Sequence, residues 1–415
     1  MARSRATRFT AVVAGVMLAT APACRGENAS PGTTGTLAPV ALRPPGLGAV
    51  TEPPVVTAGA TTTSSVVATT LPVVETTSTT SSSTTSTTTT TTVPPTPVTI
   101  TFTGEVWPQT GVVRAATPIE GVAPNFTPQF AEIAPHIAAA DLAVCHLETP
   151  VAPAELIAGL AGAGYDRCST ASERTFEGGV EAVNATASVF DDNGMTQSGL
   201  ARTPDETRPV LLEVKGIRIA HLSYTFRHEP RPPVGEEWRA AVIDVPRIVA
   251  DATTARQAGA ELVILSVHWG NADSARPNPQ QREWADQLTA SGVIDLIVGT
   301  HSHVLQPIEQ VNGVWVAFSL GNSLTYMPTN EQWSRYTQDG VVATFTVTRN
   351  ADGRPTVSAP SVRPTFVDKV AGCIIRDVST ILADPAGFDP ALVKAATDSL
   401  GRTTQILGTA FLATA

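Results

Sequence analysis

The sequence predicts an α/β fold in which two packed β-sheets are covered by helices on their outer faces. This α-β-β-α sandwich follows a disordered N-terminal tether. Short apolar runs alternate with helical patterns from residue 98 onward, an arrangement typical of α/β domains. Polar clusters directly follow several of these runs, and functional sites of such folds lie where strands end. The first 97 residues show no such pattern and are rich in Thr, Ser and Pro.

Residues 1–24 predict a signal peptide for export. Three arginines precede an apolar run over residues 9–19, which is too short for a membrane-spanning helix and typical of a secretory signal. Small residues then lead to Cys24 in an order that resembles a bacterial lipoprotein processing site. We therefore expect an exported protein held at the outer face of the cell membrane by lipid on Cys24. The alternative is a secreted protein in which Cys24 has no such role.

Residues 25–97 form the predicted tether. Thr, Ser and Pro dominate this segment, which ends in a Thr/Ser run over residues 76–92. Such a composition cannot bury enough apolar surface to offset the entropy lost on ordering. The segment therefore predicts a disordered linker that carries the following domain away from the membrane.

Composition narrows the range of partners. The chain has 27 Lys and Arg against 37 Asp and Glu, for a formal net charge of -10, which disfavours nonspecific binding to nucleic acid. Binding to an anionic polymer would need a locally basic groove or a metal ion.

Without Cys24, an odd number of cysteines remains, namely Cys145, Cys168 and Cys373. One disulfide and one free thiol fit an oxidising compartment, and the pairing stays open.

The body of the protein is predicted over residues 98–370. Apolar and β-branched runs predict strands at 98–102, 141–147, 210–214, 217–224, 261–267, 295–298, 314–320, 341–348 and 357–367. Helical patterns occur at 128–139, 177–191, 246–258 and 279–290. Lys215-Gly216 predicts a hairpin between two of the strands. A last helix, over 390–400, lies in a C-terminal extension formed by residues 371–415.

Three histidines stand at the ends of two apolar strands. His268 follows one strand, and His301 and His303 follow the other through Gly299. Residues two apart in an extended segment project to the same side, so both imidazoles should reach one centre. Imidazole is a common ligand of divalent metals, here of the Mn, Fe or Zn class. The alternative for each histidine is a hydrogen-bonded polar residue at a strand end.

The N-terminal half of the body supplies carboxylates that would complete such a centre. Glu105 follows the first predicted strand, and His146 and Glu148 lie two residues apart at the end of the second. A site that mixes imidazole and carboxylate ligands can polarise a phosphoryl oxygen and generate hydroxide at neutral pH. A solvated loop acid is the alternative for Glu105.

Together these segments resemble the CapA family, whose members are associated with poly-gamma-glutamate capsule synthesis and have a metallophosphoesterase-like fold. The resemblance runs from about residue 98 to 365 and is carried by Gly104-Glu105-Val106, 141–150, His268-Trp269-Gly270, 277–281, 299–307 and Ser319-Leu320-Gly321-Asn322. It implies a metal site whose ligands are Glu105, His146, Glu148, His268, His301 and His303. Asn322 either contacts an anionic ligand or holds a turn.

The chain departs from the family pattern at several positions. The family's Gly-Asp is Gly104-Glu105 here, and its Asn-Leu-Glu is His146-Leu147-Glu148; both changes keep a competent ligand. Its Asn-Asn-His lies within a stretch that here reads Ser172-Glu173-Arg174, and its Glu after His-Trp-Gly is Ala272.

Arg174 is the departure with the largest consequence. A guanidinium about 5 Å from a divalent ion would be repelled by about 6 to 7 kcal/mol at an effective dielectric constant of about 20, unless it points away or pairs with Glu173. The histidine it replaces would be expected to act as general acid, so catalysis should be weak or altered. An arginine can instead bind a phosphate or carboxylate bidentately, which makes Arg174 a candidate anion-binding residue.

Two functions remain open on the sequence. In the first, the protein takes part in capsule or envelope polymer biosynthesis as a metal-dependent hydrolase of the metallophosphoesterase type. Its substrate would be a phosphoester or an anionic polymer. In the second, it is a catalytically degenerate binding or scaffolding module of the envelope that keeps the fold. No serine nucleophile elbow, P-loop or Rossmann fingerprint occurs in the sequence.

Overall fold

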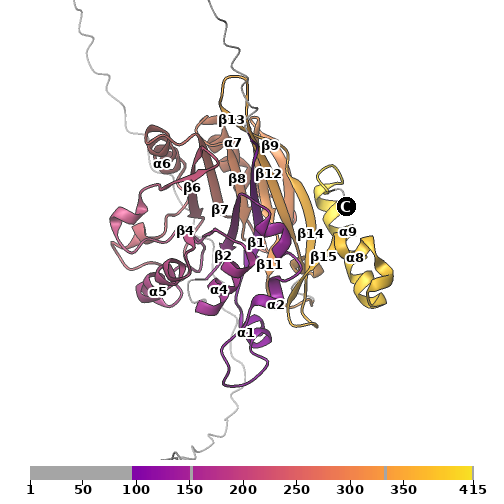
Figure 1. The fold of residues 1–415 in the computed structure, drawn as a ribbon. Coiled ribbons are helices and arrows are strands. Elements are labelled where there is room, and N and C mark those ends of the chain that lie inside the picture. The colour runs from indigo at the N-terminus through magenta and orange to yellow at the C-terminus, as the bar shows by residue number, and fades with distance from the viewer. Residues whose placement is uncertain (1–95, 150–152, 331–333, 414–415) are drawn as a thin grey trace, which may run out of the picture. The chain divides into compact units, whose positions relative to one another are not determined.

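The computed structural model describes residues 96–149, 153–330 and 334–413. They belong to one compact unit, Thr88–Ala415, and form two β-sheets with helices on either side (Figure 1). The predicted signal peptide, Cys24 and nearly all of the linker lie outside the described residues. Among the described helices, none is both long and apolar enough to span a membrane.

The larger sheet has nine strands and carries the N-terminal half of the predicted site. Its main path runs in the order β15 (Ile374–Asp377), β14 (Ser361–Asp368), β12 (Asp339–Arg349), β1 (Val98–Val106), β2 (Leu142–Leu147), β3 (Arg167–Ser169) and β4 (Thr196–Ser198). Beside this path, β11 (Asn322–Leu324) pairs with β1 and β13 (Pro355–Val357) pairs with β12. β1 to β4 run parallel to one another, so their carboxyl ends share one edge.

The smaller sheet has six strands and carries three of the predicted histidine ligands, His268, His301 and His303. Its order is β5 (Leu211–Val214), β6 (Ile217–Thr225), β7 (Leu262–His268), β8 (Leu296–Thr300), β10 (Val314–Leu320) and β9 (Leu305–Val311). β6, β7, β8 and β10 are parallel. The predicted hairpin at Lys215-Gly216 is present, with φ of +45° and +77° at these two residues.

Helices cover the outer faces of the two sheets, as predicted, and the last helix contacts strands of both sheets. The helices are α1 (Thr110–Ala116), α2 (Thr127–Phe130), α3 (Ala134–Ala138), α4 (Ala154–Ala163), α5 (Gly179–Asp192), α6 (Val245–Gln257), α7 (Pro279–Ala290), α8 (Val378–Ala383) and α9 (Pro390–Leu407). The predicted helix over 128–139 is interrupted, because Pro135 lacks the N–H that would continue α2 into α3.

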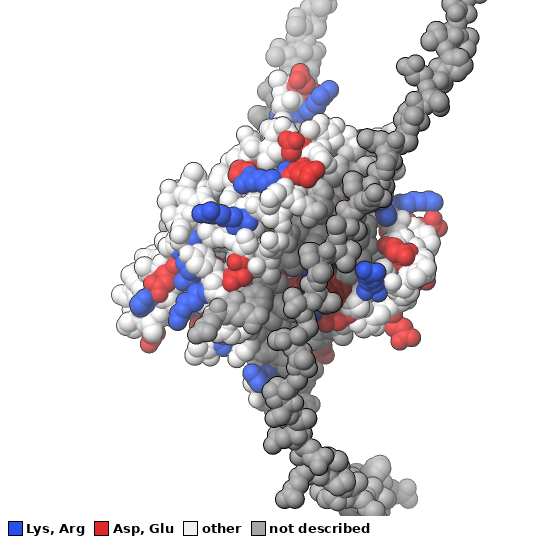
Figure 2. Space-filling view, turned by 180° about the vertical axis from the view of Figure 1, so that it is seen from behind, with Lys and Arg blue, Asp and Glu red and all other residues white. Residues whose placement is uncertain are grey.

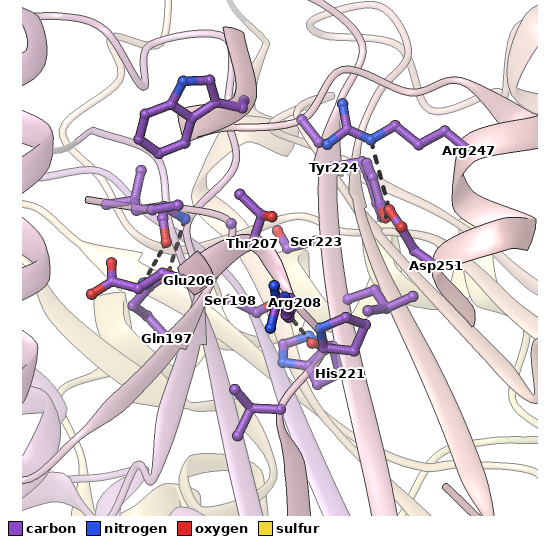
Figure 3. Close-up of a pocket in the computed structure, with 18 of the residues that line it drawn as sticks. Gln197, Ser198, Glu206, Thr207, Arg208, His221, Ser223, Tyr224, Arg247 and Asp251 are labelled. Atoms are coloured by element: carbon purple, nitrogen blue, oxygen red, sulfur yellow. Dashed lines mark hydrogen bonds and ion pairs between the residues drawn. The ribbon is translucent and has the colours of Figure 1, made fainter. Parts of the chain in front are cut away.

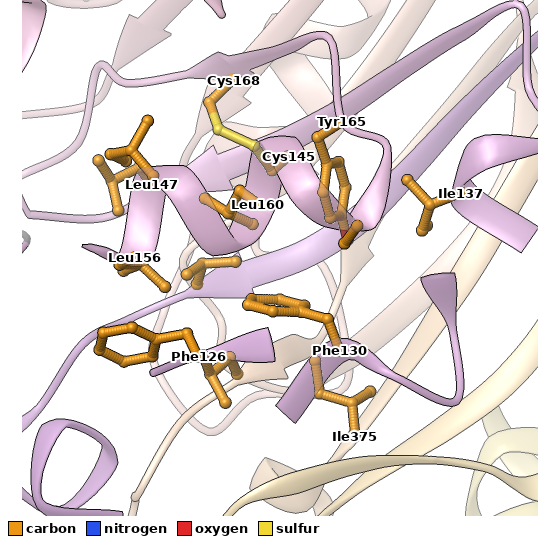
Figure 4. Packing of buried hydrophobic residues seen from close by; sticks show 14 of the residues in the cluster. Phe126, Phe130, Ile137, Cys145, Leu147, Leu156, Leu160, Tyr165, Cys168 and Ile375 are labelled. Carbon is orange, nitrogen blue, oxygen red and sulfur yellow. A yellow bond between two sulfur atoms is a disulfide. The ribbon is translucent and has the colours of Figure 1, made fainter. Parts of the chain in front are cut away.

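Three apolar clusters show the order of the layers. One cluster fills the space between the sheets and includes Phe102 of β1 and Ile264 of β7. A second lies on the outer face of the larger sheet, where Phe130 and Leu160 pack against it (Figure 4). A third covers the outer face of the smaller sheet, beneath α6 and α7, and includes Leu288. The α-β-β-α sandwich is therefore confirmed.

A disulfide joins two neighbouring strands of the larger sheet. Cys145 of β2 is bonded to Cys168 of β3 within the outer apolar cluster, beside Leu160 (Figure 4). The remaining described cysteine, Cys373, is a buried free thiol. The structure therefore has the Cys145–Cys168 disulfide, one of the pairings that the sequence leaves open.

The C-terminal extension packs on the same two sheets. Residues 374–377 form β15, an edge strand of the larger sheet. Figure 1 shows α8 and α9, in yellow, beside β14 and β15. Apolar side chains of both helices pack on Phe366 of β14. The Ala413 N–H also donates to the Val362 carbonyl over 2.8 Å, so the described part of the extension is integral to the fold.

Candidate metal centre

All six predicted ligands are buried in one place between the two sheets. Each has a fractional exposure of 5% or less. The larger sheet supplies its members from the carboxyl ends of β1 and β2, and the smaller sheet from the ends of β7 and β8. The full set is Glu105, His146, Glu148, His268, His301 and His303. Segments up to about two hundred residues apart in sequence therefore meet as predicted.

β1 extends further than the sequence predicts, and this extension places Glu105. The strand continues through Gly104 to Val106 instead of ending before Gly104. A Cβ at Gly104 would lie 2.2 Å from the Gly321 carbonyl oxygen, so a larger residue would push this segment away. The Glu105 N–H donates to that same oxygen over 2.9 Å. The close approach fixes the backbone that carries the Glu105 side chain.

Glu105 lies at the centre of the cluster. Its Oε2 lies 2.6 Å from Nδ1 of His303, and its Oε1 lies 3.2 Å from Nδ1 of His268. The backbone N–H of His301 donates to Oε1 over 2.8 Å. One carboxylate therefore contacts both histidine-bearing loops of the opposite sheet.

Two groups of possible ligand atoms share Glu105. The first combines it with His146 and His268, and the second combines it with Glu148 and His303. Within each group the ligand atoms lie within 4.8 Å of one another. Among the described residues, His301 joins neither group, although its ring centre is only 4.6 Å from that of His268. This is the geometry expected of two adjacent ion positions with a common carboxylate.

Several buried polar atoms of the cluster have no hydrogen-bond partner among the described residues. They include both carboxylate oxygens of Glu148, Nε2 of His268 and Nδ1 of His301. Buried polar atoms are nearly always paired in native proteins, and an isolated buried charge is costly. Imidazole nitrogens and carboxylate oxygens are also the atoms that bind divalent transition metals. The cluster therefore fits a divalent metal.

His301 and His303 reach the cluster from bends, and the prediction of an extended segment is wrong. Their φ angles are +90° and +56°, so both lie in the left-handed region that non-glycine residues rarely adopt. The preceding Gly299 packs tightly, because a Cβ there would lie 2.1 Å from the Phe318 carbonyl oxygen. Unusual backbone of this kind is concentrated at functional sites.

The electrostatics divide the cluster into charged and neutral groups. Burial opposes ionisation of Glu105, but attraction to His303 and hydrogen bonds from His268 and His303 outweigh it and hold its pKa well below the usual value. Burial also opposes a charge on His303, yet Glu105 and Glu148 raise the pKa of His303 to about 10. These two residues thus form a buried ion pair.

Glu148 and His146 have pKa values that are shifted in favour of their neutral forms. Burial, followed by repulsion from Glu105, raises the pKa of Glu148 to about 8. Burial, followed by repulsion from His268, lowers the pKa of His146 to about 3. At neutral pH His146 therefore offers a neutral nitrogen, whereas Glu148 must lose a proton to bind a cation.

Arg174 lies beside the cluster and is 31% exposed. Its Nε lies 3.4 Å from Oε1 of Glu148, without hydrogen-bond alignment, while its Nη1 donates to Glu177 over 2.9 Å. Its guanidinium also lies 4.6 Å from the centre of the Trp107 ring. Arg174 therefore neither points away nor pairs with Glu173, which binds Arg227 instead.

Three residues that the sequence analysis does not identify orient the histidines. The hydroxyl of Ser169 on β3 lies 2.8 Å from Nδ1 of His146. Trp107 stacks on His303 with ring centres 5.3 Å apart, and Phe226 lies 4.6 Å from the His301 ring. Aromatic and hydroxyl residues are too common for their position in the sequence to reveal these contacts.

Asn322 holds His303 in place. Its amide nitrogen donates to the carbonyl oxygens of His303, over 3.1 Å, and Thr337, over 2.8 Å. Its Oδ1 lies 3.2 Å from Nδ1 of His303. Because its polar atoms are already used, the geometry supports the turn-holding alternative over contact with an anion. Ala272, which replaces an expected glutamate, supplies no ligand atom.

Comparison with known proteins identifies the family. Residues 99–327, more than half of the chain, match the family described as Bacterial capsule synthesis protein PGA_cap. The chain belongs to this family. Membership accords with the site, because every one of the six predicted ligands falls within the matched residues.

Two curated relatives have related descriptions. The chain is 26% identical over 188 residues to "PGA biosynthesis protein CapA" of Bacillus subtilis, covering 45% of this chain and 48% of that protein. It is 23% identical over 196 residues to "Capsule biosynthesis protein CapA" of Bacillus anthracis, covering 46% of each. This PGA_cap member thus spans about half the length of the curated relatives it matches.

Solved structures with detectable similarity are more distant. The NAD nucleotidase of Haemophilus influenzae has 12% identity and a TM-score of 0.39, covering 75% of this chain and 64% of that one. The calcineurin-like phosphoesterase YfkN of Bacillus subtilis has 12% identity and a TM-score of 0.37, covering 70% of this chain and 97% of that one.

Proposed function

We propose that this PGA_cap member is an exported, metal-dependent hydrolase that acts in the biosynthesis of an anionic envelope polymer of the poly-gamma-glutamate type. The observation that carries the proposal is the pair of ligand groups that share Glu105. The family and the printed descriptions of its relatives support the link to capsule polymer.

Each part of the cluster has a defined role in this proposal. Glu105, His146 and His268 hold one divalent ion of the Mn, Fe or Zn class, and Glu105, Glu148 and His303 hold a second. His301, whose ring centre lies 4.6 Å from that of His268 and whose Nδ1 has no hydrogen-bond partner among the described residues, is a further ligand candidate for the first ion. A metal bound here supplies a Lewis acid and lowers the pKa of bound water. Ser169, Asn322 and Trp107 keep the histidine rings oriented, as partners of metal ligands commonly do.

Arg174 selects the substrate in this proposal. Acidic and basic side chains are intermixed over the described part of the face in Figure 2, so the described part of this face offers no uniformly basic surface to an anionic polymer. Arg174 is partly exposed and stacked on Trp107, and its Nε has no hydrogen-bond partner among the described residues. It can therefore bind a carboxylate or phosphate beside the metal centre.

Metal analysis combined with hydrolysis assays tests the function. The purified full chain should contain close to stoichiometric Mn, Fe or Zn by mass spectrometry, and with added Mn²⁺ it should cleave bis(p-nitrophenyl) phosphate or poly-gamma-glutamate. His268→Ala should lose both metal and activity. His136→Ala is the matched control, because His136 lies on α3 outside the cluster. Less than about a tenth of an equivalent of metal in the wild-type protein, with no effect of His268→Ala on ligand binding, would exclude the hydrolase.

A second candidate function is a binding or scaffolding module without catalysis. The position of Arg174 beside Glu148 favours it, because a fixed cation there competes with a metal ion for the same carboxylate. Tight binding of poly-gamma-glutamate without turnover, unaffected by a chelator and lost in Arg174→Met, is the result that distinguishes this function.

Export and lipid attachment are also part of the proposal. They are supported by the signal-like residues 1–24, by Cys24 and by the disulfide between Cys145 and Cys168, since disulfides persist in oxidising compartments. In a bacterial host the wild-type protein should fractionate with membranes, whereas Cys24→Ala should appear in the soluble fraction. Equal membrane association of both proteins would contradict the lipid anchor.

A further inference from the structure

A polar cavity lies where β4 of the larger sheet meets β6 of the smaller one. Its volume is about 90 Å³, several times the roughly 10–15 Å³ that one ordered water needs. Figure 3 shows the labelled side chains of Ser198, Arg208, His221 and Ser223 around it. None of these residues belongs to the Glu105 cluster.

Arg167 of β3 lines this cavity and is an unpaired buried cation. Only 2% of it is exposed, and its Nη2 donates to the Gln197 carbonyl over 3.1 Å. Its Nε has no hydrogen-bond partner among the described residues, and burial alone shifts its pKa, with no contribution from a described carboxylate. Burial lowers the pKa of Arg167 to about 10, so the guanidinium stays charged at neutral pH. A buried charge of this kind is unfavourable without a partner.

His221 of β6 supplies a second unsatisfied polar atom. It is 3% exposed, and its Nε2 lies 2.8 Å from the Ser266 hydroxyl. Its Nδ1 has no partner among the described residues. When Ser266 donates to Nε2, the proton of the neutral ring is on Nδ1, which is then a hydrogen-bond donor.

The acidic residues of the lining are already engaged elsewhere. Glu206 forms an ion pair with Arg202, and Asp251 accepts a hydrogen bond from the Tyr224 hydroxyl over 2.6 Å. They therefore do not neutralise Arg167. Arg208, which also lines the cavity, is largely exposed and forms an ion pair with Asp205.

We propose that this cavity binds an oxyanion, the carboxylate or phosphate group of a ligand, through Arg167 and His221. A guanidinium and a neutral N–H donor facing one cavity match the several acceptor oxygens of such a group. The hydroxyls of Ser198 and Ser223 lie on the same lining. This site is separate from the metal centre, so it does not depend on the proposed hydrolysis.

Anion-dependent stabilisation of the full chain tests the site without the metal centre. In the presence of EDTA and at constant ionic strength, replacing chloride by phosphate or by acetate should raise the melting temperature by about 3 °C. A larger shift with phosphate identifies a phosphoryl ligand, and a larger shift with acetate identifies a carboxylate. Arg167→Met should abolish the shift, whereas Arg354→Met, at an exposed hairpin residue, should keep it. Equal shifts in wild type and Arg167→Met would overturn the proposal.

A second measurement on the wild-type protein covers the case in which Arg167→Met does not fold. Crystals soaked in sodium selenate, an oxyanion, should show an anomalous selenium peak in the cavity, with its oxygens within contact distance of the Arg167 guanidinium. A cavity that contains only water would overturn the proposal, because solvent alone would then satisfy Arg167 and His221.

Discussion

At the scale of single residues, the proposed metal centre depends most on Glu105. Its carboxylate is common to both ligand groups and contacts the backbone of His301. The glutamate side chain is one methylene longer than the aspartate that the family pattern has at this position. The added reach suits a carboxylate that has to touch two histidines on the opposite sheet.

Removing the charge of Glu105 should therefore weaken both ion positions together. We expect Glu105→Gln to lower Mn²⁺ affinity at least about tenfold, because the amide replaces a shared anionic ligand. The control is Glu181→Gln, which changes an exposed acid on α5. Isothermal titration of both variants against the wild type measures the effect, and unchanged affinity in Glu105→Gln would rule out a shared ligand.

The two ion positions should also differ in their response to pH. A metal at the second position has to displace protons from Glu148 and His303, whose pKa values are raised to about 8 and about 10. His146, in the first position, has its pKa lowered to about 3 and has no proton to lose at neutral pH. Raising the pH from 6 to 8 should thus strengthen the second binding event by about tenfold or more per pH unit. Mn²⁺ titrations at pH 6, 7 and 8 measure this, and two pH-independent events would contradict the assignment.

At the scale of elements, glycines set how closely the strands that carry the site approach each other. Gly299 is the next-to-last residue of β8 and packs against β10. A Cβ there would lie 2.1 Å from the Phe318 carbonyl oxygen and 2.4 Å from Nε1 of Trp269. These two atoms are themselves hydrogen-bonded over 2.9 Å, so neither can move freely.

Gly299→Ala should accordingly destabilise the protein by about 1–3 kcal/mol through overpacking. The matched control is Gly162→Ala on α4, where an added Cβ meets nothing within 4 Å and where alanine should be neutral or stabilising. Chemical denaturation of both variants gives the comparison. Equal free energies of unfolding for the two variants would show that the close packing at Gly299 does not matter.

The disulfide acts at the same scale by linking β2 to β3, the strands that carry His146 and Ser169. It closes a loop with a sequence separation of 23 residues, for which the chain-entropy estimate is about 3 kcal/mol. We expect the double variant Cys145→Ser/Cys168→Ser to lose about that much stability and to be insensitive to reduction, whereas Cys373→Ser, which keeps the disulfide, should be destabilised by reduction as the wild type is. Denaturation with and without a reducing agent tests this; a wild-type curve insensitive to reduction would contradict it.

At the scale of the whole molecule, the described fold is closed by its C-terminal residues. β15, α8 and α9 cover the edge and outer part of the larger sheet. A chain truncated after residue 370 should therefore lose cooperative unfolding, because Phe366 and its neighbours become exposed. A chain that lacks residues 1–95 should keep the wild-type melting temperature, since both sheets begin at or after Val98. Calorimetry of the two truncated chains measures this, and stable, cooperative unfolding of the chain that ends at residue 370 would contradict the account.

The sequence predicts much of this fold because most strands of the smaller sheet are continuous apolar runs with clear ends. It does not predict β3 or β4, which have only three residues each and contain polar side chains such as Arg167 and Gln197. Their strand conformation comes from the pairing of β3 with β2 and of β4 with β3, which the local sequence pattern cannot reveal. The ligands of the site were predictable because they stand at strand ends with a spacing of two. The bends at His301 and His303 and the contact of Arg174 with Glu148 were not, since tertiary packing determines them.

The central claim is that two metal ions bind on either side of Glu105. Anomalous diffraction at the manganese edge, from wild-type crystals grown with Mn²⁺, tests it most directly. The account predicts two peaks, one between His146 and His268 and one between Glu148 and His303, with Glu105 in contact with both. A single peak away from Glu105, or no peak in this cluster at saturating Mn²⁺, would contradict it.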